Sequence, residues 1–179
     1  MGIELARSAF ERGGSVELWL GRHEVAPPPW IPVRPFESTA DLLRRVKGLT
    51  CDYCLVPAAI SDFAPRRREG KVPTAKGRLT LELDPTPKVI DAIRKESPGT
   101  LVAFKAESGV TKKELIARAK ERLRKSKADF IVANDLRKVT KARTSLTVLS
   151  AGGKSRDFEG LKAAAADFIW EVVAHPRRG

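Results

Sequence analysis

The chain has 179 residues, of which 42% are hydrophobic and 31% charged, a composition typical of a globular protein rather than of a disordered one. We expect residues 1–179 to form a single domain, and no apolar stretch approaches the length of a membrane span. The start, Met-Gly-Ile-Glu, shows no secretory signal, so we expect a cytoplasmic protein. The net charge of +12 favours anionic partners, such as nucleic acid or phosphorylated metabolites, or reflects a highly charged surface.

Apolar residues at helical or alternating spacing predict a mixture of helices and strands. In chain order these are a helix over 2–12, a strand over 15–20, a helix over 40–48, a strand over 53–58, a strand over 79–83, a helix from 87 to 96, a strand over 101–104, a helix over 111–125, strands over 129–133 and 146–149, and a helix over 160–174.

Local signals support several of these elements. Thr111 and Glu114 have the spacing of a capping box, and Thr86 is predicted to cap a helix with Pro87 at its first position. Gly152-Gly153 indicates a hairpin turn, and residues 79–83 alternate as a half-buried, antiparallel strand does.

The alternation of helices and strands predicts an α/β fold: a doubly wound, mostly parallel, Rossmann-like sheet with an appended antiparallel part. Such a sheet normally opens on a strand whose glycine-rich turn feeds the first helix and holds phosphate. This chain opens on the helix instead.

Small and polar residues follow three of the apolar runs. The strings are Ala-Ala-Ile-Ser-Asp-Phe at 58–63, Ala-Phe-Lys-Ala-Glu-Ser at 103–108 and Ile-Val-Ala-Asn-Asp-Leu at 131–136. Because ligands of open α/β sheets sit beyond the carboxyl ends of the strands, these strings predict a ligand pocket. The loop at 61–78, dense in Arg, Lys, Pro and Gly, is long enough to be functional.

Cys51 and Cys54 form a C-x-x-C, a spacing found in redox-active pairs and in half of a zinc site. There is no second pair, and the histidines are His23 and His175, so we expect no metal site. We interpret the cysteines as small apolar residues that lead into a strand, while their redox state stays open.

These strings, in this order and spacing, resemble the phosphopantothenate–cysteine ligases, also called phosphopantothenoylcysteine synthetases, of coenzyme A biosynthesis. The resemblance runs from residue 1 to about residue 173. Phe-Lys-Ala-Glu at 104–107 is similar to the archaeal form of the family. Further matches are Met-Gly-Ile-Glu-Leu-Ala at 1–6, Glu-Ser-Thr-Ala-Asp-Leu at 37–42, Glu-Gly-Lys-Val at 69–72, Leu-Thr-Leu-Glu-Leu at 79–83 and Pro-Thr-Pro at 85–87.

The resemblance implies a two-step ligation. The carboxylate of phosphopantothenate attacks the α-phosphate of CTP, with magnesium assisting, and the amine of cysteine then displaces CMP from the acyl-nucleotide. The residues do not distinguish CTP from ATP. The family is usually dimeric, so a homodimer is expected, with no membrane contact.

The resemblance also implies a set of nucleotide-binding residues. They are Ala58, Ala59, Asp62, Lys71, Pro87, Lys88, Val89, Ile90, Phe104, Lys125 and Asn134. Among them Lys71 matches the catalytic lysine of a flap that closes over the triphosphate. Lys76 could share that part, and Lys120 or Lys127 could replace Lys125 as a phosphate contact.

Each of these residues also has a purely structural interpretation. The alanine pair could serve tight packing, Asp62 and Asn134 could sit in turns, Phe104 could belong to the core, and the lysines could be solvated.

The family begins with a strand, a glycine-rich turn and Asn-x-Ser-Ser-Gly-Lys-Met-Gly, whose last two residues coincide with the first two of this sequence. The preceding asparagine is credited with handling the acyl-nucleotide. We therefore expect this stretch of chain to bind nucleotide weakly and to be impaired in ligation.

Two other functions are compatible with the residues. A non-catalytic nucleotide-binding subunit or scaffold would account for the helical start. A basic nucleic-acid-binding protein would account for the charge and for the Arg66-Arg67-Arg68 cluster, although the aromatic content of 6% offers little for base stacking.

Overall fold

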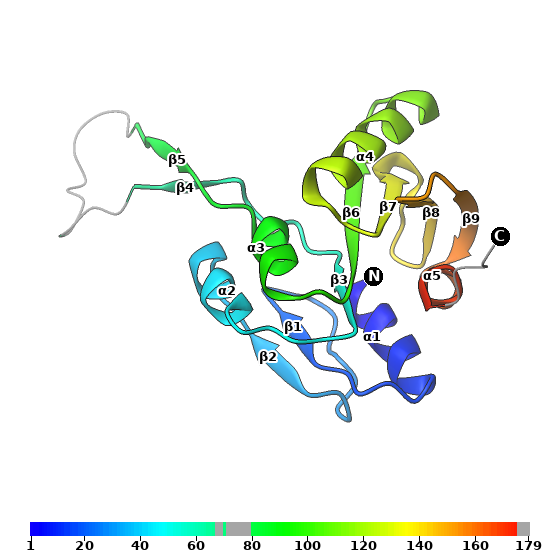
Figure 1. Cartoon of the computed structure of the whole chain (residues 1–179), viewed down its shortest axis with the longest axis horizontal. Coiled ribbons are helices and arrows are strands. Elements are labelled where there is room, and N and C mark those ends of the chain that lie inside the picture. Colours follow the sequence, from blue (N-terminus) through cyan, green and yellow to red (C-terminus); the bar gives the residue numbers. More distant parts are fainter. Residues whose placement is uncertain (67–69, 71–79, 175–179) are drawn as a thin grey trace.

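The computed structural model describes residues 1–66, 70 and 80–174, and its centre is a five-stranded sheet (Figure 1). In spatial order the strands are β3 (Tyr53–Val56), β6 (Thr100–Glu107), β7 (Phe130–Asp135), β8 (Arg143–Ser150) and β9 (Ser155–Leu161). The first three run parallel, whereas β8 and β9 are antiparallel to their neighbours. The predicted α/β fold, with an antiparallel part appended to a parallel sheet, is confirmed.

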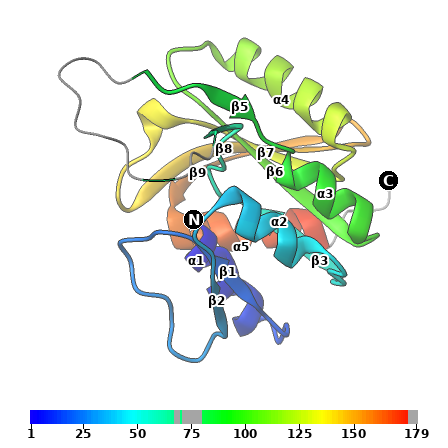
Figure 2. The ribbon, with the colours of Figure 1, turned by 90° about the vertical axis from the view of Figure 1, so that its left-hand side faces the viewer.

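Helices cover both faces of this sheet (Figure 2). One layer is made by α2 (Thr39–Val46), α3 (Val89–Glu96) and α4 (Lys112–Ser126), and the other by α1 (Gly2–Glu11) and α5 (Lys162–Ala174). Along β6, Leu101 and Ala103 face the first layer and Val102 faces the second, as the period of two in a strand requires. Within the described residues, no helix combines the length and apolarity needed to cross a lipid bilayer.

The helix starts differ in how they are capped. Thr111 and Glu114 form the predicted capping box of α4: the Thr111 hydroxyl accepts from the Glu114 amide at 3.2 Å, and the Glu114 carboxylate accepts from the Thr111 amide at 2.8 Å. The start of α3 has Lys88 at the N-cap and no side-chain cap. The prediction that Thr86 caps this helix is wrong, because its hydroxyl donates instead to the carbonyl of Ser61 at 2.9 Å.

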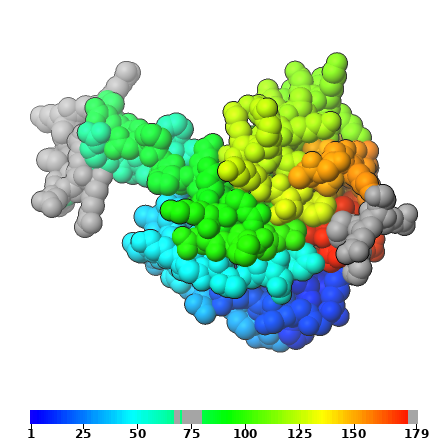
Figure 3. Space-filling model, viewed as in Figure 1, coloured from blue at the N-terminus to red at the C-terminus, as the bar shows by residue number. Residues whose placement is uncertain are grey.

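A two-stranded antiparallel ribbon extends from the body of the molecule (Figures 1 and 3). It consists of β4 (Phe63–Pro65) and β5 (Leu83–Pro85). The predicted strand over 79–83 is antiparallel, as expected, but it begins only at Leu83. Its predicted half-burial is wrong, since Leu81 is 61% exposed and Leu83 53%, and Leu79 lies outside the described residues. Alternation of leucines indicates an apolar face, but none of the described residues buries Leu81 or Leu83.

A small parallel sheet joins β1 (Leu18–Leu20) to β2 (Val33–Pro35). Its first strand is shorter than the predicted 15–20. Leu18 packs with Ala6 of α1 and with Ile31, which gives this corner a hydrophobic cluster separate from the two sheet layers.

The last strand, β9, is absent from the predicted elements, although the turn at Gly152-Gly153 is confirmed. Most of its residues are polar and exposed, so they carry no apolar periodicity. The strand forms because β8 offers it a full antiparallel ladder, and this pairing delays the start of α5 to Lys162 instead of residue 160.

Candidate functional site

The carboxyl ends of β3, β6 and β7 lie at one edge of the sheet, because these strands are parallel. The paired residues of β3 and β6 end at Val56 and Ala103. Beyond them, Ala58 and Ala59 follow β3 at the edge of the sheet where Phe104 and the residues after it lie. Asn134 is the last residue but one of β7 and lies on the same face as Phe104, two residues beyond the partner of Phe104. The structure therefore gathers four of the predicted residues at this edge.

The segment after β3 leaves its backbone open. Ala58 and Ala59 are exposed, so the packing of the described residues does not explain their small side chains. The first turn of α1 lies close by, because a Cβ added to Gly2 would lie 3.3 Å from Cγ of Pro57. This edge thus combines exposed backbone with the start of a helix.

The base of the ribbon joins the start of α3 to this group. The Thr86 amide donates to the carbonyl of Asp62 at 2.9 Å, so Pro87 and Lys88 follow directly beside the 58–62 segment. The Asp62, Pro87 and Lys88 side chains are exposed. A helix start without a side-chain cap offers free N–H groups and a partial positive charge, which together favour a phosphate.

Val89 and Ile90 take part in a different way from their neighbours. As whole residues they are 3% and 7% exposed, and their side chains pack into the core beneath α2 and α4. A ligand can therefore reach these two residues at most through their backbone N–H groups. The sequence singled out these positions without distinguishing backbone from side chain.

The predicted Lys125 stands apart from this group. Lys125 lies in the last turn of α4, paired with Glu121 at 2.6 Å. Because α4 starts after β6 and returns to the amino end of β7 over about 22 Å, its last turn lies at the opposite edge of the sheet. Lys120 is exposed one turn earlier, Lys127 follows the helix in a left-handed conformation, and Lys71 lies outside the described residues, as does Lys76.

Sequence reasoning missed two charged groups at the carboxyl edge. The Glu107 carboxylate pairs with the Lys105 ammonium at 3.0 Å and with the Arg118 guanidinium of α4 at 3.2 Å. The hydrogen bond from Lys105, followed by that from Arg118, holds the pKa of Glu107 below its usual value. The sequence signal for this group is a pair of charged residues, two positions apart, at the end of the buried strand β6.

The second group fastens the loop after β7. Asp135 accepts from the backbone amide of Arg137 at 3.0 Å and pairs with its guanidinium at 2.9 Å. The same guanidinium donates to the carbonyl of Val110 at 2.8 Å, so the loops after β6 and β7 are tied together. The hydrogen bonds from Arg137 lower the pKa of Asp135.

A hollow of about 400 Å³ lies on the far side of β7 from Ala58, between the start of α4 and the strands β7, β8 and β9. The Lys112 ammonium of α4 and the Asp157 carboxylate of β9 pair at 2.8 Å in its wall. Asp157 also accepts from the Thr147 hydroxyl at 2.5 Å, and these two contacts, that of Lys112 first, lower its pKa. Its wall thus combines this charged pair with apolar side chains such as Leu115 and Phe158.

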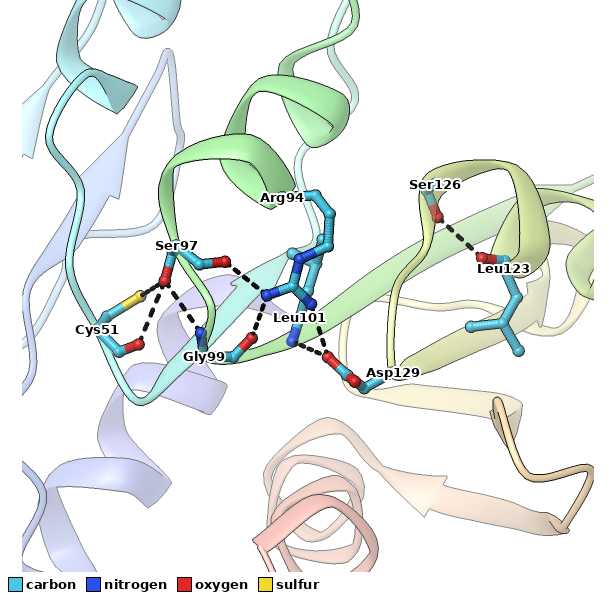
Figure 4. Close-up of polar contacts among 8 residues, drawn as sticks. All are labelled: Cys51, Arg94, Ser97, Gly99, Leu101, Leu123, Ser126 and Asp129. Carbon is cyan, nitrogen blue, oxygen red and sulfur yellow. Dashed lines mark hydrogen bonds and ion pairs between the residues drawn. The ribbon is translucent and has the colours of Figure 1, made fainter.

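At the opposite, amino edge of the sheet, polar groups are joined to one another by hydrogen bonds (Figure 4). The Arg94 guanidinium donates to the Asp129 carboxylate at 3.0 Å and to the carbonyls of Ser97 and Gly99 at 2.5 and 2.7 Å. Asp129 also accepts from the Leu101 amide at 2.8 Å. These partners belong to the end of α3 and to the first residues of β6 and β7, so the cluster is structural.

The cysteine pair lies at this amino edge. Both thiols are free, and the Cys51 sulfur lies 3.6 Å from the Ser97 hydroxyl. Burial, and after it the neighbouring Cys51, raises the pKa of Cys54 to about 12. Cys54 packs against the core and stays a neutral thiol, in agreement with its interpretation as a small apolar residue.

The fold and the group at the carboxyl edge define a class of protein, an α/β protein whose parallel strands end beside an exposed segment and a helix start without a side-chain cap. The family model for the DNA/pantothenate metabolism flavoprotein C-terminal domain matches residues 1–176. The chain belongs to this family, as the resemblance of its motifs predicted.

Curated relatives point the same way. This chain is 28% identical, over 179 residues, to the coenzyme A biosynthesis bifunctional protein CoaBC of Thermococcus kodakarensis. The match covers 97% of this chain and 44% of the relative. The chain is 36% identical over 141 residues to the protein of the same name from Methanocaldococcus jannaschii, covering 77% of this chain and 34% of the relative. The chain thus spans less than half the length of these relatives.

Solved structures share the fold. The DNA/pantothenate metabolism flavoprotein of Streptococcus pneumoniae matches with a TM-score of 0.83 at 20% identity, over 97% of this chain and 86% of that one. A Cab2 variant in complex with phosphopantothenate-cysteine matches with a TM-score of 0.75 at 18% identity, over 98% of this chain and 76% of that one. At these identities the likeness establishes the fold alone.

Proposed function

We propose that this chain provides the ligase activity of coenzyme A biosynthesis that joins phosphopantothenate to cysteine. The observation that carries the proposal is the meeting of the 58–62 segment, the uncapped start of α3, Phe104 and Asn134 at one edge of three parallel strands, in a chain of this family. The names of the relatives support the pathway, and the ligand in the Cab2 complex supports the substrate class.

In the proposed reaction, a carboxylate oxygen of phosphopantothenate bonds to the α-phosphorus of CTP and pyrophosphate leaves. The amine nitrogen of cysteine then bonds to the carbonyl carbon of the acyl-nucleotide, CMP leaves and the amine loses a proton. The substrates supply all the bonds that change. The protein is left with positioning and with neutralising charge, which together can account for most of the rate.

The residues at the carboxyl edge have distinct proposed parts. The small side chains of Ala58 and Ala59 let the nucleotide approach the backbone, and the first N–H groups of α3 bind a phosphate. Asp62, Phe104 and Asn134 contact the nucleotide, with Phe104 bordering the base.

Among the lysines, Lys71 is proposed to close over the triphosphate. Lys125, Lys120 or Lys127 contacts a phosphate only if the nucleotide reaches the far end of α4 or if a second copy presents that end, because α4 separates the two edges.

We propose that magnesium enters the site bound to the triphosphate of the nucleotide. Among the described residues, no three His, Cys, Asp or Glu side chains lie close enough together to hold a metal ion. The donors therefore do not fit a magnesium ion held by the protein alone. We assign no step to such an ion.

A homodimer is part of the proposal. The ribbon of β4 and β5 exposes Phe63, Leu81 and Leu83, each more than half exposed, and a second copy would bury this apolar surface.

The test is a calorimetric titration of the chain with CTP and magnesium, with ATP and a short DNA duplex as comparisons at physiological salt. CTP binding that weakens in Asp62→Asn supports the proposal. Asp52→Asn is the matched control, because Asp52 is an exposed aspartate directly before β3, at the opposite edge of the sheet. A chain that binds neither nucleotide, but binds the duplex in a salt-sensitive way, would refute the proposal.

Turnover provides the second readout. Pyrophosphate release that requires both CTP and phosphopantothenate identifies the first step. CMP release that requires cysteine identifies the second. Replacing CTP by ATP in the same assay establishes which nucleotide is used.

A further inference from the structure

Lys105 occupies an unusual place for a charged residue. It lies on the face of β6 that carries Leu101 and Ala103, each 1% exposed and packed beneath the helices. Its side chain is 36% exposed, where the central strand of the parallel sheet comes out at its carboxyl edge. A lysine is seldom placed on the helix-covered face of a central strand without a partner or a ligand.

The ion pairs around the Lys105 ammonium group leave it able to bind an anion as well. Glu107, 17% exposed, is its partner at 3.0 Å, but the same carboxylate also pairs with Arg118. Two cations thus share one carboxylate, and the group keeps a net positive charge. Within the described part of the chain, Glu107 is the one ion-pair partner of Lys105, so two of its three ammonium donors remain available.

The position of Lys105 also fits the proposed nucleotide. The register of β3 with β6 ends at the pair of Val56 and Ala103, so Ala58 and Lys105 each follow two residues later at the same edge of the sheet. The face that bears Lys105 is the one covered by α3, whose first residues meet the 58–62 segment. Lys105 therefore lies beside the exposed backbone that would border the phosphates.

We infer that Lys105 binds the pyrophosphate part of the nucleotide and that Glu107, anchored to α4 by Arg118, is a positioning residue that holds the ammonium at this edge. The inference rests on the proposed function for the identity of the nucleotide. The anion site itself stands on the geometry of the three charged side chains. A simple surface ion pair, by contrast, would leave ligand binding unchanged when it is removed.

The test compares ligands that differ in phosphate content: CMP, CDP and CTP with magnesium, and inorganic pyrophosphate. In Lys105→Met, the affinity for CTP and for pyrophosphate is expected to fall by about tenfold, whereas that for CMP changes by less than about twofold. Lys113→Met is the matched control, an exposed lysine of α4 that should bind every ligand as the parent does.

A further variant tests the positioning residue. Glu107→Gln keeps the lysine charge but loses the ion pair, so the ratio of CTP to CMP affinity is expected to fall by about threefold. The midpoint of thermal unfolding, measured in parallel, separates this effect from a loss of structure. An unchanged affinity ratio would show that Glu107 does not position Lys105.

The outcomes separate the inference from the proposed function. If the parent binds CTP, and Lys105→Met matches Lys113→Met on every ligand, the inference is wrong and the proposed function stands. If the parent binds pyrophosphate through Lys105 but no nucleotide, the anion site stands and the proposed function fails. If the parent binds none of the ligands, both are overturned.

Discussion

At the amino edge of the central sheet, Arg94 donates to the Asp129 carboxylate and to two backbone carbonyls, and Asp129 accepts in turn from the start of β6. At the carboxyl edge, the start of α3 has no side-chain cap, and Ala58 and Ala59 lie exposed. The same sheet thus has one end whose polar groups satisfy each other and one end whose polar groups remain available. Substitutions at the first end should change stability, and those at the second should change binding.

The largest effect on stability is expected from Gly99→Ala at the amino edge. A Cβ at this position would lie 2.0 Å from the carbonyl oxygen of Cys51 and 2.7 Å from that of Asp52, so backbone must move. We expect the free energy of unfolding to fall by about 3 kcal/mol, measured by urea denaturation. Gly152→Ala is the control, because the nearest atom to its Cβ is 3.8 Å away. Equal stability of the two variants would contradict the close packing at this edge.

A smaller loss is expected from Arg94→Ala, which removes one ion pair and two bonds to carbonyls. Because the Arg94 side chain is only 18% exposed, the free energy of unfolding should fall by about 2 kcal/mol. Arg94→Lys should recover little, since one ammonium cannot reproduce the planar set of donors. Arg124→Ala, at an exposed arginine of α4, should be near neutral. CTP affinity that falls as much as stability would show that the two edges are not independent.

The two helix starts at the carboxyl edge sharpen the comparison further. Thr111→Ala breaks the capping box of α4 and should lower the free energy of unfolding by about 1 kcal/mol. Lys88→Ala, at the start of α3, removes no cap and should leave the midpoint of urea unfolding unchanged. A comparable loss in both variants would show that α3 is capped after all.

The smallest expected effect is on the free energy of unfolding at acidic pH. The hydrogen bonds from Arg137 keep the pKa of Asp135 below its ordinary value, so the charged carboxylate stabilises the fold above about pH 4 and this contribution is lost as the pH falls through the lowered pKa. The difference in stability between the parent and Asp135→Asn should therefore be constant near neutral pH and should shrink in acid. Denaturation curves from pH 7 to pH 2 measure it. A difference that grows in acid would contradict the lowered pKa.

Much of the fold was predictable because many of its signals are local. The capping box of Thr111 and Glu114 spans four residues, and the buried runs of β6 and β7 depend only on their own apolar side chains. The same holds for the placement of small and polar residues after the strands, which located the candidate site at the carboxyl edge. The string at 103–108 included Lys105 and Glu107, but the sequence assigned this pair no role, because its ion pairs also involve Arg118, which comes from another element.

Other features could not be read from neighbouring residues. Thr86 looked like a helix cap, but its hydroxyl bonds to Ser61, which is brought to it by the ribbon. The leucines at 81 and 83 alternate as buried residues do, yet they are exposed among the residues that the structure describes. In both cases the outcome depends on how segments distant in sequence are arranged.

The sequence by itself determined the types of most elements, the family, and the residue types at the ends of the parallel strands, because periodicity, capping and turn chemistry act over a few residues. Tertiary structure decided which ends meet, where α3 begins, and that Lys125 lies at the opposite edge from Asn134. It also decided that the polar residues of β9 form a strand, since the ladder with β8 supplies hydrogen bonds that no local pattern can reveal. These decisions depend on pairing between distant segments, and that pairing exists only once the chain has folded.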